Sequence, residues 1–319
     1  MAGDLNVRER AVLDNIEGES HTLAAAPSRR GEGRPIHHYG RLAILAEPES
    51  PTATPARDVS EQWDLDKLSI VERLGLSALW LRKSKSYQYA KLHRPRADEI
   101  WDMRKCTTVV PTPVIETRAV GVRSAGPTSS YLEGSVAIGI IIVQGPTADL
   151  QFTDNEVTKV VAEVQNGLGW YATANPLAGI SFSYDIQNVN IATAPDPSAS
   201  DLEALWRNPA MGAIGYSANW DGVLAYVEDI RSRFGTRWTF CGFFTKYPLG
   251  WFAYASIGGP RLVMDYNNNG WGPDNIDRVF AHETGHIFGC PDEYASSSCN
   301  CGGSWGRFGI ANGNCENCA

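Results

Sequence analysis

The stretch Val136-Ala137-Ile138-Gly139-Ile140-Ile141-Ile142-Val143 is the longest apolar run in this chain of 319 residues. Most of its side chains are β-branched, and Gly134 and Gly145-Pro146 bound it, so the pattern predicts a buried strand. A membrane-spanning helix needs about 20 apolar residues, far more than this run contains. We therefore expect no transmembrane segment.

Two long helices are expected after this strand. Thr153 and Glu156 match a capping box, and apolar residues at helical spacing follow as far as Leu168. A second amphipathic pattern covers residues 220–234, and Gly235 is its predicted stop. Both patterns present one apolar face, as helices that cover a sheet do.

Further strands are expected between and after these helices. Residues 182–191 alternate in polarity but change phase, which predicts a bulge near Gln187-Asn188. Two more strands are predicted at residues 237–247 and 260–265. Strands alternating with helices favour an α/β or α+β sandwich.

The first 127 residues have a different pattern. Residues 1–57 are polar and rich in Ala, Pro, Arg and Glu, which predicts a linker or mobile arm, with His37-His38 as a chance pair on a loop. Residues 58–127 are expected to contain a helix at about 66–82. The basic residues near its end are expected to form a solvated face; they are Arg82, Lys83, Lys85, Lys91, Arg94 and Arg96.

Charge is distributed unevenly along the chain. Residues 1–125 contain 19 Lys+Arg and 17 Asp+Glu, a balance of +2, which leaves 9 and 19 for the remainder, a balance of −10. An acidic half with few cationic side chains argues against nucleic acid as a partner and is compatible with metal binding. The N-terminus lacks the pattern of a signal peptide, so we expect a cytoplasmic protein or export by another route.

The stretch His282-Glu283-Thr284-Gly285-His286 lies on a further predicted helix, with Asp274 as its N-cap and Gly289 as its stop. Histidines four residues apart project from one face of a helix, where both imidazoles can bind one Zn²⁺. Glu283 follows the first histidine, where it can accept a proton from water without binding the metal. Gly285 costs the helix about 1 kcal/mol relative to Ala, which suggests a tightly packed neighbour.

A catalytic zinc ion normally has a third protein ligand and one open position. Asp292, ten residues after the first histidine, is the expected third ligand and completes the pattern H-E-x-x-H-x-x-G-x-x-D. Glu293 is the second choice and Cys290 a distant third.

The motif His282 to Asp292 resembles that of the metzincin superfamily of zinc peptidases, in the Asp variant found in snapalysin-type neutral proteases. The resemblance implies an α+β domain at residues 128–319, with a mixed twisted sheet, long helices and a zinc-binding active-site helix. The region before this domain is expected to be partly disordered and partly helical. Within it, residues 58–127 are a possible pro-segment. Metzincins also have a Met-containing turn after the third ligand. No Met follows the motif here, although the native chain could extend beyond Ala319.

The implied activity is that of a zinc-dependent endopeptidase acting on a protein or peptide substrate, with Glu283 as general base for a metal-activated water. One alternative is a zinc-stabilised binding or structural protein without catalysis, which the missing Met turn and the aromatic residues Trp251, Trp271 and Trp305 would fit. Another is a zinc amidase acting on a non-protein amide. The sequence leaves the cleavage preference and the oligomeric state undetermined.

Cysteines cluster at the end of the chain, around a Gly-rich loop. They could form a second, structural zinc site or two disulfides, and the spacing leaves both open; the residues are Cys299, Cys301, Cys315 and Cys318. Cys106 could reach the zinc as a latency switch, but a buried free thiol is favoured.

Two features lie just before the motif helix. Asp265, Asn267, Asn269 and Gly270 copy the first half of a calcium loop, but Ile276 stands where a bidentate Glu is required, so a turn is favoured over Ca²⁺. The resemblance further implies that the segment 258–264 is an edge strand, which would pair with an extended substrate backbone.

Overall fold

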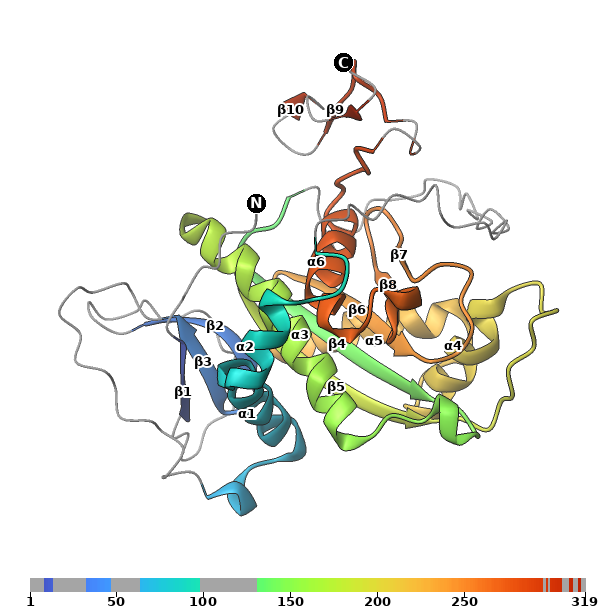
Figure 1. Ribbon diagram of the computed structural model, residues 1–319, viewed down its shortest axis with the longest axis horizontal. Helices are drawn as coiled ribbons and strands as arrows, with labels where there is room; N and C mark the ends of the chain where they lie inside the picture. The colour runs from blue at the N-terminus through green and yellow to red at the C-terminus, as the bar shows by residue number, and fades with distance from the viewer. Residues whose placement is uncertain are drawn as a thin grey trace.

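An eight-stranded mixed sheet and six α-helices make up the described part of the chain, an α+β fold (Figure 1). The structure is a computed structural model that describes residues 9–13, 33–46, 64–97, 131–294, 297, 299–305, 310–311 and 315–316. Among these residues, none of the helices is long and apolar enough to span a membrane.

The apolar run found first in the sequence is the central strand β4 (Ser135–Gln144). Parallel neighbours flank it on both sides, β5 (Ser181–Asn190) and β6 (Trp238–Thr245). β2 (Arg34–Tyr39) and β8 (Arg261–Asp265) extend the parallel set outward. The sheet order is β1-β3-β2-β5-β4-β6-β8-β7, with antiparallel strands at both ends: β1 (Glu9–Leu13), β3 (Leu42–Ala46) and β7 (Ala253–Ala255). In a separate two-stranded sheet, β9 (Ser304–Trp305) pairs antiparallel with β10 (Ile310–Ala311).

Helices cover both faces of the sheet, which explains why β4 has no polar side chain from Val136 to Val143. On one face lie α1 (Ile70–Lys83), α3 (Asp154–Ala174) and α6 (Ile276–Ile287), packed against Ile138, Ile140 and Ile142. On the other lie α4 (Leu202–Ala213) and α5 (Trp220–Phe234), packed against Ala137, Ile141 and Val143. The short helix α2 (Lys85–Leu92) follows α1.

Helix α3 begins and helix α5 ends where their sequence signals predict. Thr153 and Glu156 form the expected capping box of α3. Gly235 adopts a φ of 60° and ends α5. Helix α1 begins later than expected, at Ile70, because Ser69 and Glu72 form a capping box there.

The predicted bulge in β5 is wrong. The strand pairs with β4 in unbroken register from Ser181 to Asn190. Its apolar residues change phase because both faces of the sheet are covered: Phe182 and Tyr184 pack on the α3 side, and Val189 on the α4 side. A strand buried on both faces can place apolar residues in either phase without a bulge.

The prediction of a polar arm at residues 1–57 is wrong for the residues described there. β1, β2 and β3 belong to the main sheet, and β2 pairs with β5 of the predicted domain 128–319. His37 is fully buried on β2, where its Nδ1 lies 2.7 Å from the hydroxyl of Tyr184. The three strands are five or six residues long, too short for a clear periodicity among polar neighbours.

The edge strand is also different from the one expected at residues 258–264. β8 pairs with β6 on one side and β7 on the other, so it is an inner strand. Among the described strands, β7 forms this end of the sheet. With only three residues, β7 gives too little sequence signal to be predicted.

Candidate metal centre

Helix α6 carries the histidine motif and ends in a compact turn. Gly289 adopts a φ of 85° after the last helical turn. Its N–H donates to the carbonyl of His286 and the N–H of Cys290 donates to that of Gly285, both at 2.9 Å. These two bonds define a Schellman motif, so the predicted stop at Gly289 is confirmed. The turn reverses the chain and brings Asp292 back toward the helix.

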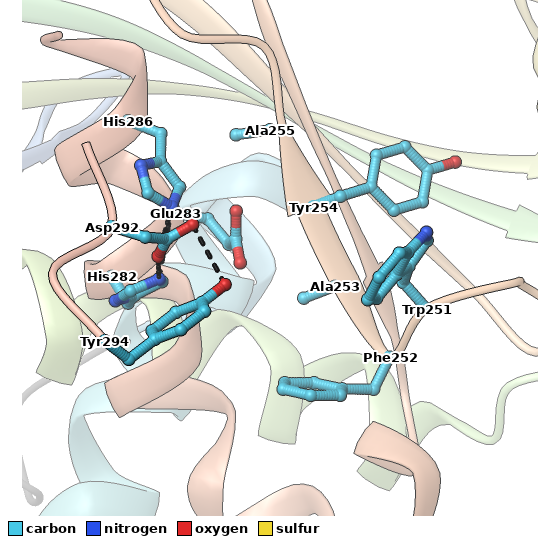
Figure 2. A pocket seen from close by; sticks show the side chains of 10 residues that line it. All are labelled: Trp251, Phe252, Ala253, Tyr254, Ala255, His282, Glu283, His286, Asp292 and Tyr294. Atoms are coloured by element: carbon cyan, nitrogen blue, oxygen red, sulfur yellow. Dashed lines mark hydrogen bonds and ion pairs between the residues drawn. The ribbon is translucent and has the colours of Figure 1, made fainter. Parts of the chain in front are cut away.

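The three predicted ligand atoms converge on one point. His282 Nε2 lies 3.1 Å from His286 Nε2, and Asp292 Oδ1 lies 3.0 Å from the first nitrogen and 3.3 Å from the second (Figure 2). Ligands held at about 2.0–2.1 Å in a tetrahedron are separated by roughly 3.3 Å from one another. The donor set and its spacing therefore fit a zinc ion.

The ring of His286 is oriented by a backbone contact. Its Nδ1 donates to the carbonyl of Cys290 at 2.6 Å, so Nε2 is the atom available to a metal. Burial alone would lower the pKa of His286, but the Asp292 carboxylate and Glu283 raise it to about 9. Burial opposes ionisation of Asp292, yet the two imidazoles lower the pKa of that carboxyl. The electrostatic field of the site favours a cation.

Glu283 points into the same pocket, and a ligand atom of its carboxylate lies within 4.8 Å of ligand atoms of His282 and His286. Its side chain is buried, and its Oε2 accepts no hydrogen bond from the described residues. Burial raises the pKa of Glu283, while the neighbouring histidines act in the opposite direction. A carboxylate held near the ligands with an unused oxygen has the placement required of a proton acceptor.

Two alternative ligands lie away from the converging atoms. Glu293 is exposed and does not line the pocket, and Cys290 offers only its carbonyl to His286. Tyr294, which the sequence reasoning missed, donates from its hydroxyl to Asp292 Oδ2 at 3.1 Å. Because this bond holds the second carboxylate oxygen, Tyr294 keeps Oδ1 directed at the histidines. An aromatic hydroxyl two residues after the ligand was the available signal.

The pocket beside this centre is bounded by β7. Figure 2 shows the motif residues facing this strand and the aromatic side chains around it; the lining residues are Trp251, Phe252, Ala253, Tyr254, Ala255, His282, Glu283, His286, Asp292 and Tyr294. The strand and the helix are joined after β7, where the N–H of Gly258 donates to the carbonyl of His286 at 2.9 Å. Trp271, by contrast, is buried and is not a surface aromatic.

The close helix contact lies at Gly167, whereas it was expected at Gly285. A Cβ at Gly285 would meet Tyr171 Oη at 3.4 Å and Cys290 Cβ at 3.7 Å, which are ordinary contacts. A Cβ at Gly167 on α3 would lie 2.4 Å from the carbonyl oxygen of Asp277. Gly167 is therefore the residue that lets α3 and α6 pack together.

The remaining sequence features lie outside this centre. Cys299 and Cys315 form a disulfide, and Cys301 is disulfide-bonded as well, so the structure follows the disulfide alternative at these residues. Cys318 and Cys106 lie outside the described residues. The Asp265 carboxylate accepts the N–H groups of Asn267 and Asn269 at 3.2 and 3.0 Å, which closes the turn that leads toward α6.

Comparisons with known proteins add little to this geometry. The sequence matches no family model, and no curated protein matches it. Among solved structures, it is similar to metalloproteinase-II from Bacteroides fragilis, with 12% identity over 76% of this chain and a TM-score of 0.33. The chain spans 66% of the length of that metalloproteinase. A TM-score of 0.33 establishes neither a shared fold nor a shared function.

Proposed function

We propose that this protein is a zinc-dependent endopeptidase of the metzincin type. The observation that carries the proposal is the convergence of His282, His286 and Asp292 to within 3.0–3.3 Å of one another. Two imidazoles and one carboxylate, with solvent access from the pocket, are the ligand set of a catalytic zinc site.

The chemistry divides between the metal and the chain. When bound, zinc acts as a Lewis acid and lowers the pKa of water. Glu283 accepts the proton of the attacking water through its unused Oε2 and transfers it to the leaving amine. Tyr294 holds Asp292 in place during this sequence by its bond to Oδ2.

The substrate backbone is expected to pair with β7. In the antiparallel pair with β8, the backbone groups of Phe252 and Ser256 form hydrogen bonds to β8. The backbone groups of the residues between them point alternately away from β8 and toward it. The backbone groups of Ala253 and Ala255 therefore face the open side of the strand, which lines the pocket. An extended peptide added there would gain main-chain hydrogen bonds next to Glu283.

Glu283→Gln tests the proposal directly. The zinc-loaded variant should bind zinc as the parent does but hydrolyse casein about 10²–10⁴-fold more slowly, because it lacks the proton acceptor. Glu228→Gln, an exposed position on α5, is the matched control and should keep full activity.

Equal hydrolysis by Glu283→Gln and the parent would contradict the proposal. Zinc binding by the parent without casein cleavage would favour the non-catalytic alternative. Cleavage of a peptidoglycan amide without casein cleavage would favour an amidase.

A further inference from the structure

The N-terminal end of α6 lacks a cap from its own stretch of chain. Asp274, the predicted N-cap, lies in a short 3₁₀ turn, and its carboxylate pairs with Lys159 of α3. Asn275 precedes the helix but makes no side-chain cap; its amide donates to the carbonyls of Trp271 and Pro95. The prediction of Asp274 as N-cap is therefore wrong.

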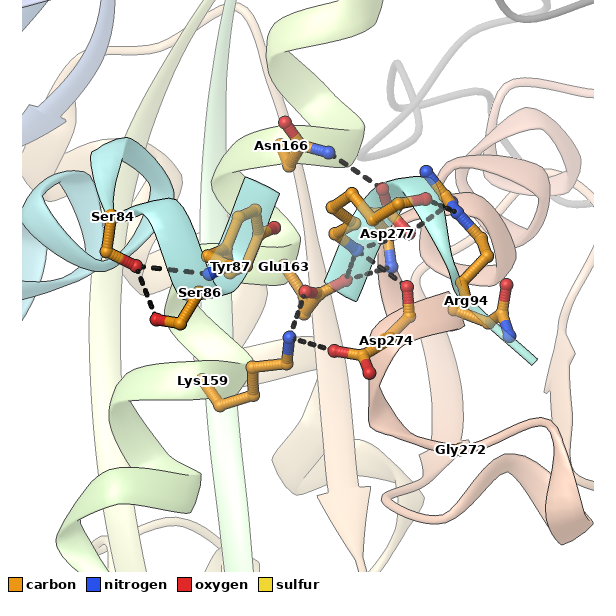
Figure 3. Close-up of polar contacts among 12 residues, drawn as sticks. Ser84, Ser86, Tyr87, Arg94, Lys159, Glu163, Asn166, Gly272, Asp274 and Asp277 are labelled. Carbon is orange, nitrogen blue, oxygen red and sulfur yellow. Dashed lines mark hydrogen bonds and ion pairs between the residues drawn. The ribbon is translucent and has the colours of Figure 1, made fainter. Parts of the chain in front are cut away.

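A carboxylate from α3 caps the helix instead. Glu163 Oε2 accepts the N–H of Asp277, in the first turn of α6, at 3.0 Å. The Glu163 side chain is fully buried, and its Oε1 lies 2.9 Å from Lys159 Nζ (Figure 3). A negative charge at this place also complements the positive end of the helix dipole.

Lys91 of α2 links this cap to α6. Its Nζ pairs with Glu163 Oε2, lies 3.0 Å from Asp277 Oδ1 and donates to the carbonyl of Asp274 at 2.7 Å. The side chain is 9% exposed. The Tyr87 ring covers the cluster, with its centroid 5.1 Å from Lys91 Nζ and 4.5 Å from Lys159 Nζ. Lys91 is the cation that contacts both buried carboxylates.

Residues 85–97 contribute positive charge to the cluster. Glu163, Asp274 and Asp277 face Lys91, Lys159 and Arg94. Although burial opposes its ionisation, Lys91 and Arg94 lower the pKa of Asp277. Two of these three cations, Lys91 and Arg94, therefore come from residues 58–127, which were expected to be a possible pro-segment. Removing one partner from a buried ion cluster leaves an uncompensated charge, which strongly destabilises its surroundings.

We propose that Lys91 and Glu163 are positioning residues for the metal centre. They hold the first turn of α6, and because the helix is rigid, the position of that turn sets where the two histidines stand about two turns later. On this proposal, which rests on the proposed metal site, residues 85–97 are an integral part of the metal-binding fold. They are not an inhibitory segment to be removed.

Lys91→Met in the full chain tests the proposal with two measurements. Zinc affinity, measured by competition with a chromophoric chelator, should fall about tenfold or more. In the metal-free variant, the rate of amide hydrogen exchange, relative to that of the parent, should increase more in α6 than in α5. Arg82→Met is the matched control, because it breaks a similarly buried ion pair with Glu9 of β1, and the side chain of Arg82 bonds to Glu9 and to Gln165 of α3, not to α6. It should lower stability while leaving zinc affinity unchanged.

A double variant separates positioning from general damage and covers the case in which Lys91→Met fails to fold. In Lys91→Met with Glu163→Gln, the glutamine carbonyl still accepts the Asp277 N–H and needs no buried cation. Zinc affinity and α6 protection should therefore recover toward those of the parent.

Unchanged zinc affinity and unchanged α6 exchange in Lys91→Met would overturn the proposal, as would equal loss of affinity in Arg82→Met. Failure of the double variant to recover either property would overturn it too. None of these measurements needs peptide hydrolysis, so the proposal can stand where the endopeptidase assignment fails.

Discussion

The two ends of α6 are secured by different means. At the C-terminal end, Gly289 and the Schellman bonds close the helix within six residues of chain, and Asp292 follows at once. At the N-terminal end, the cap comes from Glu163, which is 114 positions away in the sequence, and its counter-charge comes from Lys91, 72 positions further back. One end is a local turn and the other is a tertiary cluster.

This difference explains why one end could be predicted and the other could not. A glycine with positive φ leaves a signal at a fixed distance from the helix. A carboxylate delivered by another helix leaves none, and the acidic Asp274 nearby gave a false local signal. The metal ligands therefore depend on one contact visible in the sequence and one that only the fold creates.

Breaking the N-terminal cluster is expected to have the largest effect on stability. Asp277→Ala removes the partner of Lys91 and Arg94 and the acceptor for Asn166, so buried cations lose a counter-charge. We expect a loss of about 3–5 kcal/mol in the free energy of unfolding, measured by urea denaturation. Glu228→Ala, which breaks an exposed pair on α5, should cost less than about 1 kcal/mol. A similar small loss for Asp277→Ala would contradict the buried cluster.

A smaller loss of stability is expected at the C-terminal end. Gly289→Ala forces a Cβ into the left-handed region, at a cost of about 1–2 kcal/mol. Zinc affinity should fall as well, because the turn places Asp292. Gly179→Ala is the control, since Gly179 also has a positive φ and lies on another loop with open space around it. Gly179→Ala should lose a similar amount of stability but keep the full zinc affinity of the parent. Equal zinc affinity in the two variants would show that the turn at Gly289 does not position Asp292.

The smallest effect is expected in the middle of the helix. Gly285→Ala places a methyl group in ordinary contact with Tyr171 and Cys290, so it should raise stability by up to about 1 kcal/mol. Gly167→Ala, where the methyl would meet the Asp277 backbone, is expected to destabilise instead. Thermal unfolding of both variants tests this. Destabilisation by Gly285→Ala would restore the idea of a tight contact beside the histidines.

The sequence allowed prediction wherever the physical signal is local. The buried strand β4, the capping box of α3 and the helix of the histidine motif each have a pattern within 20 or so residues. The basic residues Lys91 and Arg94 were expected in solvent, because nothing near them in sequence shows that Glu163 and Asp277 lie opposite. The edge strand β7 was missed for the same reason, since an edge is a property of the whole sheet.

The pairing of β2 with β5 also bears on how the chain folds as it is synthesised. His37 stands opposite Phe182 in the sheet, so the N-terminal strands cannot complete their pairing until the ribosome has released about 190 residues. Contacts between segments so far apart slow folding, because a long loop must close before they form. Until then, β1–β3 can form only their antiparallel unit, with one side of β2 unpaired. Such an open strand is a site for association with chaperones or with other nascent copies.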